Sequence, residues 1–187
     1  MELSSKDCGQ QPETLIKAVE LIERSFKRGG KLLICGNGGS AADASHMAGE
    51  LVKSFEKKRT LTRRLAENLE NAGGESGILL AKLLHIGLPA ISLAADGAVI
   101  SAIANDIGAD AIFAQQVFAL GNDRDALFCI STSGESQNII YAALAAKAQG
   151  MKVIGLVGRK DCSLAGYCNL LITAGDGPVA SIQSKHQ

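Results

Sequence analysis

Aromatic residues are scarce in this sequence: it has no tryptophan, and Phe and Tyr together make up only 4% of its 187 residues. Hydrophobic residues nevertheless account for 47%. The core must therefore be built mainly from Ala, Leu, Ile and Gly, which suits helices packed closely on a sheet. A chain of this length fits one domain and is long enough to bury a sizeable core.

The sequence also lacks an excess of charge and a long apolar run. Lys plus Arg and Asp plus Glu number 19 each, which gives a formal net charge of zero. Charge alone therefore does not draw the chain to nucleic acid or to an anionic membrane. No apolar run is long enough to span a bilayer, and the first ten residues lack the basic and apolar regions of a signal peptide. We expect a cytoplasmic protein.

Cysteine pairing motifs are absent as well. The five cysteines form no CxxC pair and no zinc-finger spacing. Cys35 and Cys129 lie inside apolar runs, where a small buried hydrophobic side chain is expected rather than a ligand or a nucleophile.

The stretch of residues 31–51, KLLICGNGGSAADASHMAGEL, organises the rest of the chain. A short apolar strand is followed by a Gly-Asn-Gly-Gly turn, and Ser40 is placed to cap the helix that comes next. A strand, a glycine-rich turn and a helix N-terminus in this order form an anion site, because free N–H groups and the helix dipole converge there. The stretch therefore predicts phosphate binding.

Apolar strands alternate with helical segments along the remaining chain. Uniformly apolar strands joined by helices predict a parallel sheet covered on both faces. The expected strands are 32–35, 89–94, 126–130, 152–157 and 170–173. The expected helices are 14–28, the helix after the first turn, 65–84 with a break at 72–74, 98–105, 111–120 and 137–149. In such a sheet ligands bind outside the carboxyl ends of the strands, where both polar turns fall.

The second polar turn, Ser131-Thr132-Ser133-Gly134-Glu135-Ser136, has four hydroxyls in six residues. Hydroxyls and free N–H groups can hold a phosphate monoester where no Lys or Arg is present. The alternative is an ordinary turn in which Ser136 caps the next helix and the other hydroxyls are idle. We favour phosphate binding. The Walker pattern is absent, and GNGGS is not a dinucleotide fingerprint.

His46 and Glu50 are four residues apart and so share one helix face. They can hold a divalent metal, or Glu50 can act as a base; on spacing alone a surface pair or a capped core histidine is the alternative. Asn105 and Asp106 can bind sugar hydroxyls or simply terminate a helix. His85 is given no function.

On these motifs the chain resembles the phosphoheptose isomerase branch of the sugar isomerase (SIS) domain family. The matching segments are CGNGGSAADASHMAGEL, the Ala-Asn-Asp of 104–106, IFAQQVFALG, ISTSGESQNII, GMKVIGLVG and Ile182-Gln183. The resemblance implies a single domain over 1–187 with an N-terminal helix at 12–28 and a core at 31–175. The fold it implies is a three-layer αβα sandwich with a five-stranded, flavodoxin-like parallel sheet. It also implies a homotetramer with active sites between subunits.

The activity implied by the resemblance is conversion of sedoheptulose 7-phosphate to D-glycero-D-manno-heptose 7-phosphate through an enediol, toward lipopolysaccharide heptose. Glu50 is implied as the base, and His46, Glu50 and Gln183 as ligands of one zinc ion. The residues implied to contact substrate are Asn37, Gly38, Gly39, Ser40, Asn105, Asp106, Ser131, Thr132, Ser133, Ser136 and Gln183.

The sequence departs from the family pattern near its C-terminal end. The family's last helix carries a second catalytic His about two turns after the Gln, whereas His186 follows Gln183 by only three residues. We expect a C-terminal helix that is cut short. The alternative function is therefore a non-catalytic SIS-domain protein that binds a phosphosugar or a protein such as a replication initiator.

Overall fold

The computed structural model describes residues 11–174, which form five strands and seven α-helices with two short 3-10 helices. The strands are β1 (Leu32–Gly36), β2 (Ala90–Ser92), β3 (Ala126–Ser131), β4 (Lys152–Val157) and β5 (Leu170–Thr173). The helices are α1 (Gln11–Lys27), α2 (Gly39–Lys53), α3 (Arg63–Gly73), α4 (Glu75–Leu83), α5 (Gly97–Asp106), η1 (Ala109–Ala111), α6 (Ile112–Leu120), α7 (Gln137–Ala148) and η2 (Ser163–Tyr167). None of the helices in this described part is long and apolar enough to cross a membrane.

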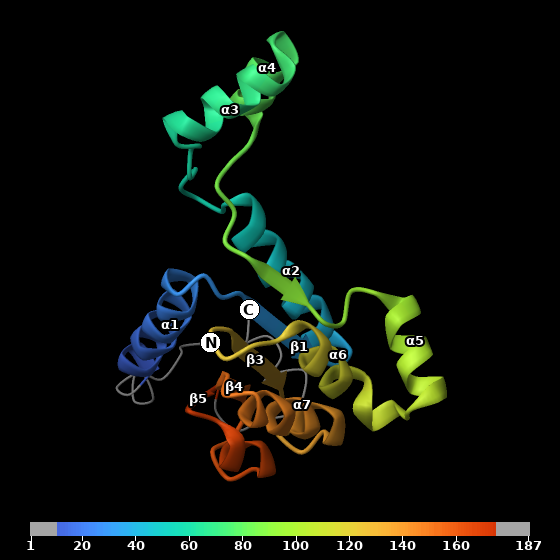
Figure 1. The fold of residues 1–187 in the computed structure, drawn as a ribbon. Coiled ribbons are helices and arrows are strands. Elements are labelled where there is room, and N and C mark those ends of the chain that lie inside the picture. Colours follow the sequence, from blue (N-terminus) through green and yellow to red (C-terminus); the bar gives the residue numbers. More distant parts are fainter. Residues whose placement is uncertain (1–10, 175–187) are drawn as a thin grey trace, which may run out of the picture.

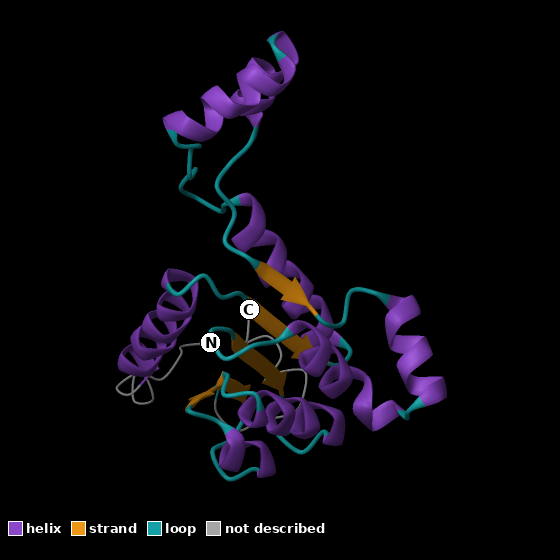
Figure 2. Cartoon of the chain, viewed as in Figure 1, coloured by secondary structure: helices purple, strands orange, loops and turns teal. Residues whose placement is uncertain are grey.

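The five strands form one parallel sheet in the order β2-β1-β3-β4-β5 (Figure 2). The order reverses between β1 and β3, whose register pairs Leu32 with Ala126 and Gly36 with Ile130. The chain runs from β1 to β2 on one side and then crosses from β2 to β3 on the other side of β1. In sheets of this kind ligands bind outside the carboxyl ends of the two strands at which the order reverses. The expected five-stranded, flavodoxin-like parallel sheet is confirmed, and both polar turns leave the sheet at the point where the order reverses.

Helices cover both faces of the sheet, because side chains of successive strand residues point to opposite sides. On one face, Leu32, Ile34 and Phe128 pack with side chains of α1 and α2. On the other face, Leu33 and Leu127 pack with α6, α7 and η2. The three-layer αβα arrangement predicted from the sequence is therefore present in the described chain (Figure 1).

The expected second strand is shorter and less buried than the sequence suggested. The apolar run 89–94 predicted a buried strand, but β2 has three residues at the edge of the sheet, and Ile91 is 38% exposed. The prediction of burial was wrong because an apolar run alone does not distinguish a central strand from an edge strand.

Helices α3 and α4 form a hairpin that stands away from the sheet (Figure 1). The helices meet at Gly74, whose φ of 54° is a left-handed conformation that glycine adopts without strain. The two connecting stems run side by side: Thr60 forms an antiparallel bridge with His85, and the Ile86 N–H donates to the Arg59 carbonyl. The predicted break at 72–74 is confirmed.

Candidate functional site

The candidate site lies at the carboxyl ends of β1 and β3, where the strand order reverses. The first turn, residues 36–39, leads from β1 into α2, and the second, residues 131–136, leads from β3 into α7. Each helix has at least twelve residues, so its N-terminus contributes oriented N–H groups and a favourable dipole for an anion.

The first turn is shaped by glycine. Gly38 has a φ of 54° and stands at the N-cap of α2, which begins at Gly39 with no side-chain capping hydrogen bond. The prediction that Ser40 caps this helix was therefore wrong, since Ser40 is already inside the first turn and is buried. Gly36 is required here for another reason: a Cβ at this position would lie 2.5 Å from the Ser40 carbonyl oxygen. Asn37, Gly38 and Gly39 are exposed.

The second turn uses two of its own hydroxyls to hold its shape. The buried Ser131 Oγ accepts a hydrogen bond of 3.0 Å from the Gly134 N–H, and the exposed Ser133 Oγ accepts one of 3.1 Å from the Glu135 N–H. A hydroxyl that accepts from the backbone keeps its own proton for a ligand. Ser136 occupies the N-cap of α7, but its side chain makes no capping hydrogen bond. The alternative interpretation, in which the Ser136 side chain caps α7, is thus wrong.

Asn37 and Asn138 join the two turns. Each amide donates to the other's oxygen at 2.9 Å, although the residues are 101 positions apart in the chain. The pair links the two polar turns directly. Sequence reasoning missed Asn138. The available signal was an amide in the first turn of α7, the helix that follows β3, because β3 neighbours the strand that precedes Asn37.

The second turn is also anchored to the segment that follows β4. The Ser163 N–H donates to Glu135 at 3.0 Å and its hydroxyl donates to the other carboxylate oxygen. These Ser163 contacts hold the pKa of Glu135 below its ordinary value, and Arg159 adds a smaller effect in the same direction. The Leu164 N–H donates to the Gly134 carbonyl at 3.0 Å. Glu135 therefore holds the turn in position, and both of its carboxylate oxygens accept hydrogen bonds from Ser163.

His46 and Glu50 lie on one face of α2, as predicted. His46 is exposed, whereas the Glu50 side chain is only 22% exposed and forms an ion pair of 2.7 Å with the Lys53 ammonium. Glu50 is eleven residues beyond Gly39, which places it about 16 Å along the helix axis from the first turn. A phosphate at that turn and a reacting carbon at Glu50 of the same chain are thus separated by most of the length of α2.

Comparison with known proteins identifies the family. A family model described as "SIS domain" matches residues 3–78 and 70–158. The chain is 41% identical over 162 residues to the phosphoheptose isomerase of Nitratidesulfovibrio vulgaris, covering 87% of this chain and 65% of that protein. It is 38% identical over 176 residues to the phosphoheptose isomerase of Roseiflexus, covering 94% of this chain and 76% of that protein. The chain thus spans just under two thirds of the first relative and about three quarters of the second.

A solved phosphoheptose isomerase from Francisella tularensis superimposes with a TM-score of 0.77 at 33% identity, covering 95% of this chain and 81% of that one. This chain belongs to the phosphoheptose isomerase family of SIS-domain proteins. The expected family and fold are therefore confirmed, and these comparisons do not favour the non-catalytic alternative.

Two other residues expected to contact substrate in this family lie apart from the turns. Asn105 and Asp106 are exposed at the C-terminal end of α5, where the Asn105 amide donates to the Asp106 carboxylate at 2.7 Å. Helix α5 packs against η1 and α6 and stands outside the sheet (Figure 1).

The expected zinc ligands of the family are only partly within the described chain. Gln183 lies outside residues 11–174. Within that range, no group of three or more His, Cys, Asp and Glu side chains comes close enough to hold a metal. His85, which was given no function, has its Nδ1 2.7 Å from the Lys53 carbonyl oxygen at the base of the hairpin.

Proposed function

We propose that the chain is a phosphosugar ketose–aldose isomerase that converts sedoheptulose 7-phosphate to D-glycero-D-manno-heptose 7-phosphate. The single observation that carries this proposal is the reciprocal Asn37–Asn138 hydrogen-bond pair, which holds two helix-N-terminal turns together at the point where the strand order reverses. Two sets of oriented N–H groups at one end of the sheet suit a phosphate monoester.

The phosphate would be held mainly by neutral donors. Ser133 and Ser136 offer hydroxyl protons, Thr132 is half-buried beside them, and the backbone of the first turn is exposed opposite. Gly134, with a φ of 70°, lets the backbone bend around the anion. Buried Ser131 stabilises the turn and can still donate its own proton.

Glu50 would be the base that moves the proton. A ketose–aldose isomerisation transfers one proton between adjacent carbons through an enediol, which requires a carboxylate at the carbon and an acid or cation at the oxygen. Glu50 is largely buried, and Lys53 holds its carboxylate in place from one side. We therefore assign the proton transfer to Glu50.

His46 and Glu50 suit two ligand positions for zinc, because imidazole nitrogen and carboxylate oxygen on one helix face are common zinc donors. Lys53 must give up its ion pair with Glu50 for this, since its ammonium occupies the same carboxylate. Gln183 would be the third ligand. When bound, zinc would polarise the substrate carbonyl and stabilise the oxyanion of the enediol.

We further propose that active sites form between subunits of a cytoplasmic homotetramer. The distance of about 16 Å along α2 between the first turn and Glu50 supports this, since one substrate must reach both a phosphate cradle and a base. The exposed position of Asn105 and Asp106 at the end of α5 also suits residues that face a neighbouring subunit.

The test is a coupled assay of sedoheptulose 7-phosphate conversion with added zinc. Glu50→Gln should abolish turnover, because an amide cannot accept the proton. Its matched control, Glu56→Gln, changes an exposed carboxylate in the loop after α2 and should retain the parent rate. A Glu50→Gln protein that isomerises as fast as the parent would exclude the proposed base.

The phosphate cradle is tested separately by Ser133→Ala combined with Ser136→Ala. This change should raise KM for the sugar phosphate at least about tenfold, because each lost hydrogen bond to a charged group is worth about 1.5–3 kcal/mol. An unchanged KM would contradict the assignment of the second turn.

A further inference from the structure

A cavity of about 520 Å³ lies at the end of the sheet opposite to the two polar turns. It opens between α1 and the amino-terminal ends of β3, β4 and β5, where Asp125, Lys152 and Leu170 line it. Its volume lies within the range of small-molecule sites. The proposed isomerase site does not use this cavity, since its turns are at the carboxyl ends of the strands.

Six cationic side chains line the cavity and come from three separate parts of the chain. They are Lys17, Arg24, Lys27 and Arg28 of α1 and the residue after it, Arg124 of the loop before β3, and Lys152 at the start of β4. Asp125 is the one carboxylate among the lining residues. Its charge is already matched by the Lys31 ammonium at 2.7 Å. Asp125 therefore does not neutralise the cations that line the cavity, and those without a carboxylate partner of their own can attract an anion.

Some of these cations already have a carboxylate partner, and others do not. Within α1, Lys17 pairs with Glu13, Arg24 with Glu20 and Lys27 with Glu23, each four residues away and well exposed. Arg28, just after α1, forms an exposed pair of 3.7 Å with Asp123. Such pairs are weak and readily exchanged. Arg124 and Lys152 are different, because neither forms an ion pair with any carboxylate in the described chain.

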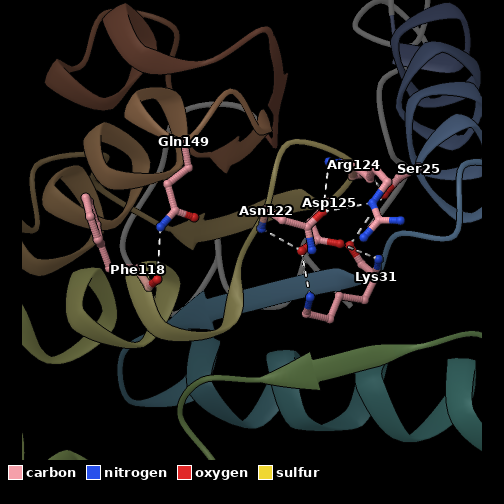
Figure 3. Close-up of polar contacts among 7 residues, drawn as sticks. All are labelled: Ser25, Lys31, Phe118, Asn122, Arg124, Asp125 and Gln149. Carbon is pink, nitrogen blue, oxygen red and sulfur yellow. Dashed lines mark hydrogen bonds and ion pairs between the residues drawn. The ribbon is translucent and has the colours of Figure 1, made fainter.

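Arg124 is oriented by a neutral partner. The Asn122 side-chain oxygen accepts from the Arg124 backbone N–H at 3.0 Å and from its Nε at 3.3 Å (Figure 3). An amide oxygen orients the guanidinium without neutralising it, so Arg124 keeps its net positive charge and can bind an anionic ligand. Arginine held in this way is well suited to bind phosphate oxygens through two N–H groups.

Hydrogen bonds and a close backbone contact join the segments around Arg124 and Asp125 at the cavity. The buried Ser25 Oγ donates to the Arg124 carbonyl at 2.6 Å, and a Cβ at Gly30 would lie 2.2 Å from the same oxygen. Asp125 accepts from the Lys31 N–H at 2.8 Å and from the Asn122 N–H at 2.9 Å (Figure 3). These contacts fasten the end of α1, the start of β1 and the start of β3 to one another before any ligand binds.

We propose that this cavity binds a nucleoside diphosphate. The cations supply the charge for two linked phosphates, and their arrangement over several elements suits a polyanion better than a single phosphate. Half-buried Leu21 and Leu170 line the cavity as well and give an apolar surface for a base. Ligand sites combine apolar lining with a few placed polar groups in this way.

The experiment is titration calorimetry of the full chain with ADP as the probe and adenosine as the uncharged comparison. We expect saturable binding of ADP and none of adenosine. Arg124→Gln combined with Lys152→Gln should weaken ADP binding at least about tenfold, because two charge-assisted hydrogen bonds are lost. Both side chains are exposed, so the variant should fold as the parent does.

Two control variants distinguish binding in this cavity from a general charge effect and from binding at the polar turns. Lys57→Gln with Lys58→Gln removes the same charge from an exposed loop after α2 and should leave ADP affinity within twofold of the parent. Ser133→Ala with Ser136→Ala, at the other end of the sheet, should also leave ADP affinity unchanged. Absence of saturable ADP binding would overturn the proposal, as would equal losses in the two charge variants or a loss confined to the serine variant. Isomerase activity is read independently, so the two proposals can fail separately.

Discussion

Asp125 is the residue that joins α1, β1 and β3 at the amino-terminal end of the sheet. Its carboxylate is fully buried and accepts from the Lys31 N–H, the Lys31 ammonium and the Asn122 N–H. Removing one partner of a buried ion pair leaves the other charge and two N–H groups unsatisfied.

We therefore expect Asp125→Ala to lower the free energy of unfolding by about 2–4 kcal/mol, measured by urea denaturation. Asp123→Ala is the matched control, because Asp123 forms only a surface pair of 3.7 Å with Arg28. That control should cost less than about 1 kcal/mol. Equal losses in the two variants would show that the Asp125 contacts do not stabilise the fold.

The buried Cys129 and the half-buried Cys168 should be chemically inert. Hydrogen bonding to Cys35, whose sulfur lies 3.7 Å away, together with burial raises the pKa of Cys129, and burial raises the pKa of Cys168 to about 12. The reactive form of cysteine is the thiolate. A raised pKa means that less thiolate is present at pH 8 than in an ordinary cysteine.

We expect iodoacetamide at pH 8 to leave Cys129 and Cys168 unmodified in the native protein and to modify both in denaturant, as measured by peptide mass spectrometry. Rapid modification of either residue in the native protein would contradict its raised pKa.

At the residue scale, the sequence predicted the types of group at the site better than their individual contacts. Both polar turns and the shared face of His46 and Glu50 follow from local spacing, which the structure retains. Ser40 was misassigned as a cap because the glycines allow α2 to begin two residues earlier, with Gly38 at the cap position. Asn138 was missed because its partner is 101 residues away, and spacing within one segment carries no information on such a contact.

The α3–α4 hairpin depends on close contact between its two helices. Gly77 is buried against α3, and a Cβ there would lie 1.9 Å from the Leu69 carbonyl oxygen. We expect Gly77→Ala to separate the helices and to speed amide hydrogen exchange at least about tenfold across 63–83, while β1 and β3 keep their protection.

Gly73→Ala is the control for the hairpin, since the nearest atom to a Cβ at Gly73 is the Ser76 Cβ at 4.0 Å. This change should leave exchange across the hairpin at the parent rate or slow it, because alanine favours helix more than glycine does. Unchanged exchange in Gly77→Ala would mean that the hairpin tolerates a wider separation.

At the scale of elements, the sequence predicted the alternation of strands and helices and the break between α3 and α4. These features depend on local apolar spacing and on glycine. The sequence did not predict that β2 would be a short edge strand or that the hairpin would stand away from the sheet (Figure 1). Position within a sheet depends on contacts between distant segments, which no single apolar run encodes.

At the scale of the whole molecule, we have proposed that each active site is formed by two subunits of a homotetramer. If one subunit supplies the phosphate turn and another supplies Glu50, a variant impaired in the phosphate turn and a variant without the base should complement each other. We expect Glu50→Gln and Ser133→Ala/Ser136→Ala proteins, mixed and refolded together, to show more activity than either variant alone at subsaturating substrate. Activity equal to the average of the separately refolded variants would place both groups in one subunit.

The central claim is that Glu50 moves a proton on a phosphosugar held at the two turns. The most direct measurement is NMR of sedoheptulose 7-phosphate incubated with the protein and zinc in heavy water. We expect stereospecific deuterium uptake at the carbon beside the carbonyl, at a rate that falls at least about a hundredfold in Glu50→Gln. Bound sugar phosphate with no deuterium uptake, or uptake that is unchanged in Glu50→Gln, would contradict it.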